Sequence, residues 1–574
     1  MPPNPLLRTA LVLSATGIVS ASSVRYAMAQ GGSDLPLIAG YAFYLALLLI
    51  AISPRPPRWM AAITFALVAI TYVLAVVTLG GNVVAIGLYV VAAYLAFLAT
   101  PPQLRPLTVA AFALWTPALR FFGPDPFAGE FPPLLALAAV LALGAVVAPL
   151  IDRRARDHGE RMRRIGLGLL AVAAVATVVE RHLVVSSPGV APDDVMALVV
   201  AGALPLLVVA RVRPATREAL ATGLALAAFA LTAMALLLGK GYHVDAVTVP
   251  HHAAELLLAG ENPYRSFDLP EALAEFGLDP ELATHLEDGR VLRSLSYPAM
   301  SFLVVAPAVA LGATDIRWVY VGEILVLVLL LLRRVRSPWR PLVAAGAVGN
   351  TIIVRQNILA GVDPTWALLV MLGWLFLDSP FSAVAIGLAA ASRQPAWFVA
   401  PFYLVVVWRR AGRSEALWRA AVVAVAALLP NLPFIVDAPR EFFAGISAPM
   451  LGALAPSGIG LVGMGLDGLL PLLPRGVYGG LSALSFVALI VTLWRFWPRI
   501  PGAAMVFPFV PLYLGWRSLQ NYFCWLPLLA MAGDDELLAG SSAERLRPSA
   551  ASALAPSTIP APASSGATPS STAP

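Results

Sequence analysis

Long apolar segments that carry almost no charge follow one another along this chain, and they limit what it can fold into. A helix needs about 20 predominantly apolar residues to cross the hydrocarbon core of a bilayer, and fewer where other protein shelters it. The first 239 residues contain nine segments that approach this length, separated by short loops. We expect them to form helices near residues 9–27, 35–52, 60–79, 83–99, 107–121, 132–150, 165–184, 195–211 and 218–239.

The composition is that of a protein whose main solvent is lipid. Of the 574 residues, 59% are hydrophobic and 12% are charged, and the mean hydropathy is +0.81. Water-soluble domains are about 45–50% apolar and about 25% charged. These values exclude a soluble domain and predict an all-α, polytopic transmembrane helical bundle, because helices satisfy their backbone hydrogen bonds internally in lipid.

The composition also excludes two kinds of site. Cys524 is the only cysteine, so the chain can form neither an internal disulfide nor a cysteine-based zinc cluster. No arm rich in Lys and Arg with interleaved aromatic residues is present. We therefore expect no nucleic-acid partner.

The distribution of arginine predicts the orientation of the chain in the membrane. Loops rich in Lys and Arg stay on the cytoplasmic side. Basic residues fall in alternate loops of the N-terminal region, at 55–58, 105, 152–164 and 211–217. With a cytoplasmic N-terminus all nine crossings agree, and residues 240–297 are extracytoplasmic.

The second half of the chain contains shorter apolar segments between Arg-rich loops. The loops at 333–340, 409–419 and 495–499 are expected to be cytoplasmic. Residues 298–332 have the pattern of two short helices, whereas the charge rule requires an odd number of crossings; either one half is re-entrant or interfacial, or 333–340 is an exception. Further spans are expected near 341–354, 358–377, 381–392, 395–408, 420–436, 479–494, 501–516 and 519–532.

These patterns divide the chain into four regions. We expect an N-terminal transmembrane block (1–239), an extracytoplasmic polar loop (240–297), a C-terminal transmembrane bundle (298–534) and a disordered tail (535–574). The tail is rich in Ser, Ala, Pro and Thr and lacks the apolar content needed to fold. A multi-pass protein of the cell membrane is therefore expected.

The polar loop, residues 240–297, is too long to be a simple connector. Loops beyond about 12–15 residues tend to be functional or disordered. Its sequence predicts amphipathic helices over 251–260 and 270–289, the first ending at Gly260 and Pro263. Such helices present carboxylates to water, so a solvated face is the simplest interpretation of Glu271, Glu275, Asp279, Glu281, Glu287 and Asp288.

Asp245 stands apart from those carboxylates because it lies about five residues beyond the expected end of a span, beside His243. An ionisable group at such a depth is costly unless it has a function. A structural alternative is an Asp that caps the following helix. His251 and His252 are adjacent, so on a helix they point about 100° apart and cannot easily share one ion. We expect no metal site there.

Several short motifs follow one another between residues 235 and 530. The chain has an Asp just after an expected transmembrane helix, a helix ending in LLLAGENPY, and then the segment YPAMSFLVVAPAVALG at 297–312. This order resembles that of the GT-C superfamily of integral-membrane glycosyltransferases, and the chain is most similar to the polyprenol-phosphate-mannose-dependent mannosyltransferases. The segments 355–378 and 383–410 are similar to that family's G-Q-x-N helix and to its G-x-L-x-G-L-A-x-x-x-K-x-x-P helix.

The chain also departs from that family. The base-bearing loop follows the ninth expected helix rather than the first, so the resemblance leaves about 215 N-terminal residues unexplained. The D-x-x-V-Y motif is present as 245-DAVTV-249, without its tyrosine. Ala299 replaces the second proline of Y-P-P, and Arg393 replaces the usual lysine.

The resemblance implies transfer of a sugar, with mannose the first candidate, from a polyprenyl-phosphate donor. The acceptor is a lipid-linked or envelope glycan outside the cytoplasm, and the expected partners are these two substrates and membrane lipid. Asp245 occupies the position of the general base, and neither a cofactor nor a metal is expected. The expected substrate-binding residues are His243, Glu261, Asn262, Tyr264, Arg265, Arg355 and Arg393.

Two other classes of function fit the same sequence. A transporter or flippase of lipid-linked sugars would have ionisable residues near mid-membrane and broken helices in corresponding positions of two repeats. Glu323 lies inside an expected span, and Asp363 and Asp378 lie near span ends, but the sequence has no evident repeat. A non-catalytic subunit of an envelope-polymer complex would use its N-terminal helices to bind other subunits. Replacement of Asp245 separates the catalytic hypothesis from the assembly hypothesis.

Overall fold

The computed structural model describes residues 213–335 without 240 and 243, Arg340, and residues 361–532 without 362, 453, 459, 467–470, 498–500, 524, 526–527 and 530–531. The described residues are mostly helical (71%). The first eight expected spans, His243, Arg355, the expected span 341–354 and the tail 535–574 lie outside them.

The helices of the polar loop and of its flanks come first in chain order. They are α9 (Pro214–Gly239), α10 (Asp245–Leu258), α11 (Pro263–Ser266), α12 (Leu269–Glu275), the 3-10 turn η1 (Pro280–Leu282), α13 (Met300–Leu303), α14 (Ala306–Ala310) and α15 (Arg317–Arg334).

The C-terminal elements follow after residue 360. They are α17 (Pro364–Leu375), α18 (Phe381–Ala390), α19 (Pro395–Ala411), α20 (Arg413–Leu428), α21 (Leu432–Asp437), α22 (Pro439–Leu451), β1 (Ser457–Gly458), α23 (Leu461–Leu466), α24 (Arg475–Phe496), η3 (Pro501–Met505), α25 (Phe509–Leu514), β2 (Arg517–Ser518) and α26 (Gln520–Phe523).

Two of the described helices are long and apolar enough to cross a membrane. They are the 21 residues Glu218–Leu238 of α9 and the 22 residues of α24. Both coincide with expected spans. On α24 the side chains of Leu484, Val487 and Val491 are exposed. Exposed aliphatic rows of this kind are typical of a surface that faces lipid or another protein.

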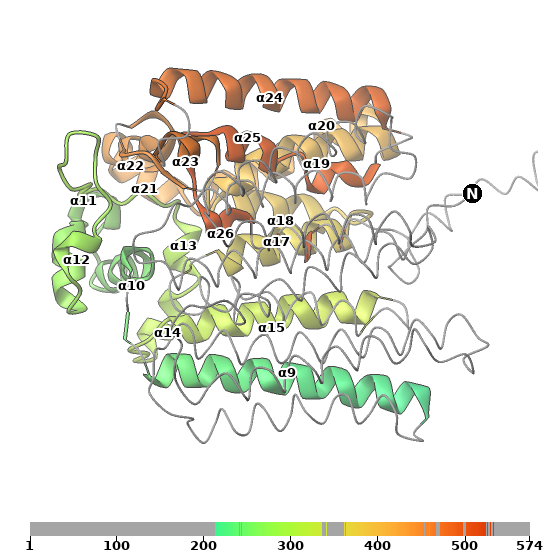
Figure 1. The fold of residues 1–574 in the computed structure, drawn as a ribbon, viewed down its shortest axis with the longest axis horizontal. Helices are drawn as coiled ribbons and strands as arrows, with labels where there is room; N and C mark the ends of the chain where they lie inside the picture. Colours follow the sequence, from blue (N-terminus) through green and yellow to red (C-terminus); the bar gives the residue numbers. More distant parts are fainter. Residues whose placement is uncertain are drawn as a thin grey trace, which may run out of the picture. The chain divides into compact units, whose positions relative to one another are not determined.

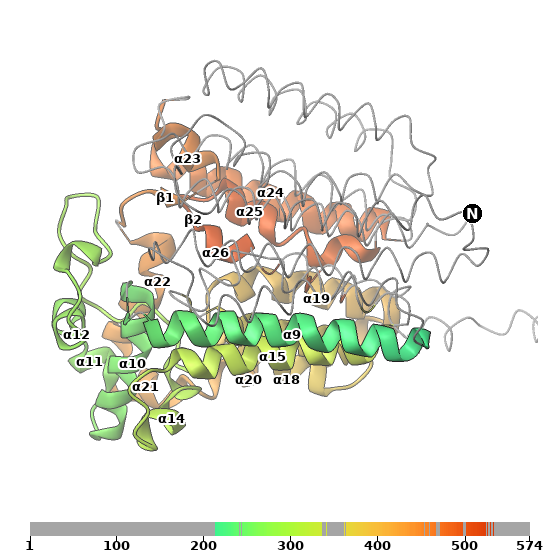
Figure 2. The same cartoon turned by 60° about the horizontal axis from the view of Figure 1, so that its bottom comes forward.

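The bundle is built by close packing of short apolar helices. Helix α17 packs on α18 and α18 on α20, while α19 contacts both α20 and α24. Gly387 allows α18 and α20 to approach, because a Cβ there would lie 2.5 Å from the Val423 carbonyl oxygen and 2.6 Å from the Ala426 Cβ. Small residues at helix interfaces are the usual means of close helix packing in membranes. Helices α9 and α15 lie side by side (Figures 1 and 2).

The helices of the polar loop gather at one end of α9 and α15, together with α14, α21 and α22 (Figures 1 and 2). An aromatic core holds this end together. The Tyr264 ring lies 4.7 Å from Phe442, 5.6 Å from Phe434 and 6.1 Å from Phe302, measured between centroids. Aromatic pairs at such distances contribute about 0.5–1.5 kcal/mol each beyond their area burial.

Local sequence explains the short helices of this end. Helix α10 carries Asp245 in its first turn, where a negative charge favours the helix dipole. After it, Gly260 adopts φ +83°, a left-handed conformation that glycine accepts without strain. The Asn262 side chain caps α11 by accepting the Tyr264 N–H at 3.0 Å, and Pro263 occupies the first helical position.

Several expected boundaries were wrong. Residues 270–289 do not form one helix: α12 ends at Glu275, Gly277 has φ +66°, and Pro280 starts only a 3-10 turn. The expected span 420–436 is interrupted between α20 and α21. The segment between the expected spans 420–436 and 479–494 contains α22 and α23.

The strands β1 and β2 pair in parallel and bring two distant loops together. Ser457 lies opposite Arg517, and Gly458 lies opposite Ser518. The chain before β1 also contacts the polar loop, because the Ala455 N–H donates to the His285 carbonyl oxygen at 3.0 Å. These contacts place Arg517 at the end of the described helices where α10 begins.

Candidate functional site

Asp245 is the first residue of α10 and is partly buried. The Thr284 hydroxyl, from the far side of the polar loop, donates a 2.6 Å hydrogen bond to its Oδ2. The Thr248 hydroxyl donates to the Asp245 carbonyl oxygen at 2.8 Å and braces the same turn. The helix-cap position itself is Val244, which makes no side-chain cap. The carboxylate of Asp245 is thus held by a side chain 39 residues away.

The electrostatic surroundings make Asp245 a stronger base than an ordinary aspartate. Burial raises the pKa of its carboxyl group, because water no longer stabilises the charge. The hydrogen bond from Thr284 and the positive charge of Arg517 oppose this rise in pKa. A carboxylate with a raised pKa holds an abstracted proton more firmly, as general-base catalysis near neutral pH requires.

Arg393 lies between α18 and α19 with only 3% of its surface exposed. Its Nε is 3.4 Å from Oδ1 of Asp363, a fully buried carboxylate that also accepts a 2.8 Å hydrogen bond from Trp366 Nε1 and one from the Asn521 amide. Nε and Nη1 of Arg393 have no hydrogen-bond partner among the described residues. A buried guanidinium with unused donors can bind an anion.

Tyr297 links Arg393 to Asp245. The Arg393 Cζ lies 4.1 Å from the centroid of the Tyr297 ring, within cation–π range. Burial raises the pKa of the Tyr297 hydroxyl; the positive charge of Arg393 opposes this rise and the negative charge of Asp245 adds to it. Tyr297 therefore lies within electrostatic reach of both Arg393 and Asp245.

Arg517 adds a second cation to this group. Its Nη1 donates to the Ala455 carbonyl oxygen at 2.9 Å, and the β1–β2 pair fixes its backbone. Its charge acts on Asp245, and the Tyr522 hydroxyl lies within reach of the charges of both Arg393 and Arg517. Arg517 thus acts on the Asp245 carboxylate, while Arg393 contacts Tyr297, which lies within reach of that carboxylate. A proton acceptor near such cations suits a reaction with an anionic leaving group.

The backbone at 295–300 is held firmly against the C-terminal helices. The Gln394 amide donates to the carbonyl oxygens of Ser296 and Ile446 at 2.7 and 3.2 Å. The Asn431 side chain accepts the Ala299 N–H at 2.8 Å. These bonds set the position of Tyr297 relative to the residues that follow α18.

An apolar groove of about 430 Å³ adjoins this group of side chains. Pro298, next to Tyr297, and Ala390, near Arg393, lie at one part of its wall. Small and aliphatic residues of α20 and aromatic residues of α22 complete it, including Ala424, Ala427, Leu428, Phe442 and Phe443. Phe443 and Leu428 are exposed, so the groove opens to the surroundings of the protein.

Four of the expected substrate-binding residues lie in another place. Asn262 Nδ2 donates to Oδ2 of Asp437 at 2.6 Å, and Arg265 Nη2 donates to the Asp437 carbonyl oxygen at 2.5 Å. Tyr264 is buried in the aromatic core, and its hydroxyl donates to the Tyr297 carbonyl oxygen at 2.8 Å. Glu261 is exposed. This turn joins the polar loop to α21, and the Tyr264 hydroxyl connects it to the Tyr297 backbone.

The structure also identifies residues that were not among the expected catalytic and substrate-binding residues. Thr284 and Arg517 contact or act on Asp245, Asp363 pairs with Arg393, and Tyr297 lies between the two groups. Arg517 carried a usable signal, because it interrupts an apolar stretch on the side of the membrane predicted for Asp245. Thr284 carried none, since a threonine in a polar loop is ordinary.

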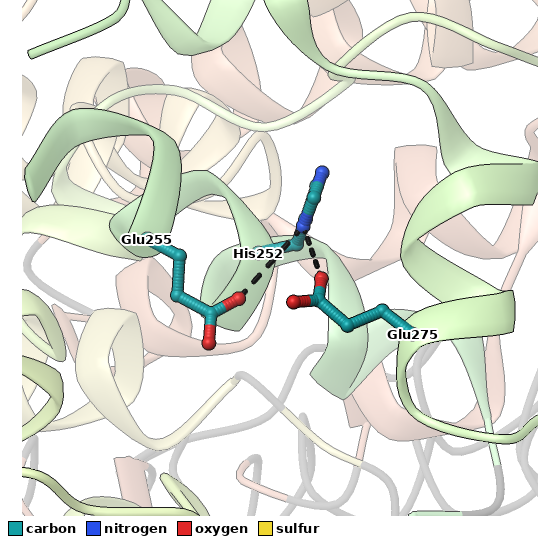
Figure 3. Close-up of side chains that lie close together, drawn as sticks. All are labelled: His252, Glu255 and Glu275. Carbon is teal, nitrogen blue, oxygen red and sulfur yellow. Dashed lines mark hydrogen bonds and ion pairs between the residues drawn. The ribbon is translucent and has the colours of Figure 1, made fainter. Parts of the chain in front are cut away.

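The adjacent histidines have different hydrogen-bond partners, although each lies within 4 Å of one oxygen of Glu255. His251 Nδ1 lies 2.8 Å from the Tyr242 hydroxyl, which also accepts the Ile316 N–H at 2.9 Å. His252 Nδ1 lies 2.5 Å from Oε2 of Glu275. Figure 3 shows His252 between Glu255 and Glu275. Among the described residues this is the group of side chains whose spacing would admit a metal ion.

Comparisons of the chain with profiles of known protein families, with curated proteins and with solved structures find no match. The fold is mostly helical, and two of its described helices are candidates for membrane spans. A functional assignment therefore depends on the chemistry of the Asp245 group and on the sequence motifs that contain it.

Proposed function

We propose that the protein is an integral-membrane glycosyltransferase of the GT-C type. It transfers a sugar, with mannose the first candidate, from a polyprenyl-phosphate donor to a lipid-linked or envelope glycan. The observation that carries this proposal is the position of Asp245: its carboxylate is oriented by Thr284 and lies near the charges of Arg517 and, across Tyr297, of Arg393.

The proposed reaction needs one proton acceptor and stabilisation of one leaving group. An acceptor hydroxyl oxygen forms a bond to the anomeric carbon of the donor sugar, and the bond from that carbon to the phosphate oxygen breaks. Asp245 takes the hydroxyl proton. Polyprenyl phosphate leaves with the bonding electron pair, and attack from the face opposite the phosphate inverts the anomeric centre.

Arg393 and Arg517 are the proposed phosphate-binding residues. The planar guanidinium group donates two parallel hydrogen bonds to phosphate, and it retains its charge when buried. Nη1 of Arg393, which has no hydrogen-bond partner among the described residues, supports this role, while Nε faces Asp363. A leaving phosphate gains negative charge as its bond to the sugar breaks, so positioned cations lower the barrier.

The apolar groove is the proposed binding site of the isoprenoid chain. It begins beside Pro298, the residue after Tyr297, and extends over α20 and α22. A lipid lying there would bring its phosphate to the polar end of the groove, toward Arg393. Its lining of Ala, Leu, Ile and Phe suits hydrocarbon, while Asn431 in the same wall is occupied by the Ala299 N–H.

The helix directions support a placement of this site at the outer face of the cell membrane. The polar loop meets the last residues of α9, the first of α15 and the first of α24, where Arg475 contacts Glu287. Arg213, Arg333 and Arg495 lie at the other ends of these helices, as the positive-inside rule requires of a cytoplasmic side.

The crossing count of residues 298–332 also fits this topology. Helices α13 and α14 together cover residues 300–310, roughly 16 Å, which is too short for a crossing. The 18 residues of α15 extend about 27 Å. One crossing between the polar loop and residues 333–340 gives the odd number that the charges require.

The test is transfer of sugar by the purified full chain in detergent or liposomes. Radiolabelled polyprenyl-phosphate-mannose is the donor and an extract of envelope glycolipids the acceptor. Asp245→Asn keeps the shape of the side chain and removes its basicity, so we expect product formation to fall by about 10²–10⁴-fold. Full transfer by a well-folded Asp245→Asn variant would exclude the assigned base.

A transporter or flippase of lipid-linked sugars is the second candidate. The buried pair Arg393–Asp363 and the 2.9 Å hydrogen bond from Thr365 to Glu323 favour it, because ionisable residues among apolar helices commonly mark transport pathways. This alternative predicts donor movement across liposomes without sugar transfer, and movement that survives Asp245→Asn. An assembly subunit predicts neither activity in the purified chain.

A further inference from the structure

A second group of polar side chains lies in the polar loop, away from Asp245. His252 is in α10, Glu255 follows it by one helical turn, and Glu275 is the last residue of α12. One donor atom from each lies within 4.8 Å of the donor atoms of the other two. His252 Nδ1 is 2.5 Å from Glu275 Oε2 and 3.8 Å from Glu255 Oε2 (Figure 3).

Two features of this group are those of a ligand site rather than of an ordinary ion pair. His252 is only 7% exposed, yet its Nδ1 faces two carboxylates at once. Glu255 Oε2 is buried and has no hydrogen-bond partner among the described residues. Its distance of 3.8 Å to His252 Nδ1 is too long for a hydrogen bond, and a buried carboxylate oxygen without a partner is costly.

We propose that His252, Glu255 and Glu275 bind one divalent transition-metal ion, with Zn²⁺ the best match. One imidazole nitrogen and two carboxylate oxygens are a ligand set that zinc accepts, with a water in the fourth position. Tetrahedral ligands at about 2.0–2.1 Å from zinc lie about 3.3 Å from one another. The distances of 2.5 and 3.8 Å lie on either side of that value, so small side-chain rotations suffice.

The ion would also remove an electrostatic conflict. The carboxylates of Glu255 and Glu275 lie close enough to act on each other, and each carries a negative charge when ionised. A doubly charged cation between them converts repulsion into attraction. His251 is not one of the proposed ligands: its Nδ1 is occupied by the Tyr242 hydroxyl, and its Nε2 lies 3.7 Å from Oε1 of Glu255, where it can orient that carboxylate.

The position in the fold assigns the ion a structural role. It would join α10 to α12 across the 23 residues that separate His252 from Glu275. His252 lies about two helical turns from Asp245 along α10. The ion therefore does not touch the proposed reacting groups; it fixes the helix that begins with Asp245.

Metal binding is testable without any assay of sugar transfer, so its failure and that of the proposed function are distinguishable. The full chain, purified in detergent without a histidine tag, is treated with EDTA and transferred to EDTA-free buffer. Zn²⁺ affinity is then measured by competition with a chromogenic chelator. We expect one Zn²⁺ per chain, Mg²⁺ binding at least tenfold weaker, and a rise in the unfolding temperature on addition of Zn²⁺.

Glu275→Gln is the diagnostic variant and Glu271→Gln the matched control. Both glutamates are on α12 and exposed, and only Glu275 faces His252. We expect Zn²⁺ affinity to fall at least tenfold in Glu275→Gln and to remain unchanged in Glu271→Gln. Equal affinity in both variants, or no Zn²⁺ bound by the wild type, would overturn the proposal.

X-ray absorption at the zinc edge supplies a measurement that does not depend on folding of a variant. The wild type loaded with one equivalent of Zn²⁺ should show a single imidazole nitrogen among oxygen ligands. A coordination shell without imidazole, or with two or more imidazoles, would exclude the site.

Discussion

Thr284 and Asp245 are 39 residues apart in the chain, and the hydroxyl of the first donates a 2.6 Å hydrogen bond to Oδ2 of the second. This bond connects the first helix of the polar loop to the segment that precedes its last residues. It orients the carboxylate and stabilises its charged form against the effect of burial. The candidate base therefore depends on the fold of the loop as well as on its own position in α10.

Removal of this hydrogen bond should shift the pH dependence of the reaction. Thr284→Val keeps the shape of the side chain and deletes the donor. Because the bond lowers the pKa of Asp245, its loss raises that pKa, and the acidic limb of the rate profile moves to higher pH. We expect about a tenfold loss of rate below neutral pH and near-normal rates on the basic side. The control is Thr492→Val on α24, whose hydroxyl donates to the Ala488 carbonyl oxygen of the same helix.

The wild-type rate should itself rise with pH over a range higher than that of an ordinary aspartate. Burial raises the pKa of Asp245, while Thr284 and Arg517 oppose this rise. Tyr297 lies within reach of the Asp245 charge. Below its pKa the carboxyl group is protonated and cannot accept the hydroxyl proton.

Stability should depend on pH in the opposite sense. A group whose pKa is raised by folding stabilises the fold at pH values below its pKa in the unfolded chain, and this contribution is lost as the pH rises through its pKa in the folded protein. Activity and stability should thus change in opposite directions, as rate profiles and thermal unfolding over the same buffers will reveal. A rate independent of pH between 4 and 8 would contradict the assignment.

Arg517 should contribute to use of the phosphate donor. Arg517→Met removes its charge and its bond to Ala455, and Arg517→Lys keeps the charge without the bidentate fork. We expect kcat/KM for the donor to fall about 100-fold in the first variant and about tenfold in the second. Arg440→Met is the control, since Arg440 is exposed on α22. Equal donor kinetics in Arg517→Met and wild type would remove Arg517 from the site.

The pair of Arg393 and Asp363 should be important for stability. Breaking a buried pair by removing one partner typically costs about 3–5 kcal/mol, because the other charge is left uncompensated. We expect Asp363→Asn and Arg393→Met each to lower the unfolding temperature in detergent markedly. The double variant should recover much of the loss, since it buries no lone charge. Additive losses in the double variant would show that the two side chains do not interact.

Gly445 on α22 should tolerate no side chain. A Cβ at this position would overlap the carbonyl oxygen of Leu295, in the segment that leads to Tyr297. We expect Gly445→Ala to cost about 1–3 kcal/mol. Gly479→Ala is a matched control within α24, where a Cβ meets nothing within 4 Å and alanine is the better helix former. Thermal unfolding of both variants checks the difference; equal stability would contradict the packing.

The sequence predicts the helices of this fold better than the contacts between them. The spacing of apolar residues and the positions of the arginines predict α9, α19 and α24. Arg393 lies buried between α18 and α19, which agrees with a position at a helix break. The expected helix over 270–289 failed at Gly277 and Pro280, whose turn-forming tendency outweighed the apolar spacing.

The candidate site was only partly predictable for a related reason. Asp245 and Arg393 have types and positions that are unusual in apolar sequence. Thr284 is unremarkable in sequence, and its role arises only because the loop folds back onto α10. Tyr264 was expected at the substrate but packs among Phe302, Phe434 and Phe442, since a tyrosine whose hydroxyl finds a backbone acceptor is easily buried.

The pairing of β1 with β2 has a consequence for synthesis of the protein. A ribosome makes the chain from its N-terminus, and segments fold as they emerge. Asp245 is synthesised before Arg517. Arg517 takes its position near Asp245 only after the segments 454–458 and 517–518 have both been made and have paired. On the proposed function, the nascent chain would carry its general base without the second cation until residue 517 has been made, so full transfer activity would require the last described helices.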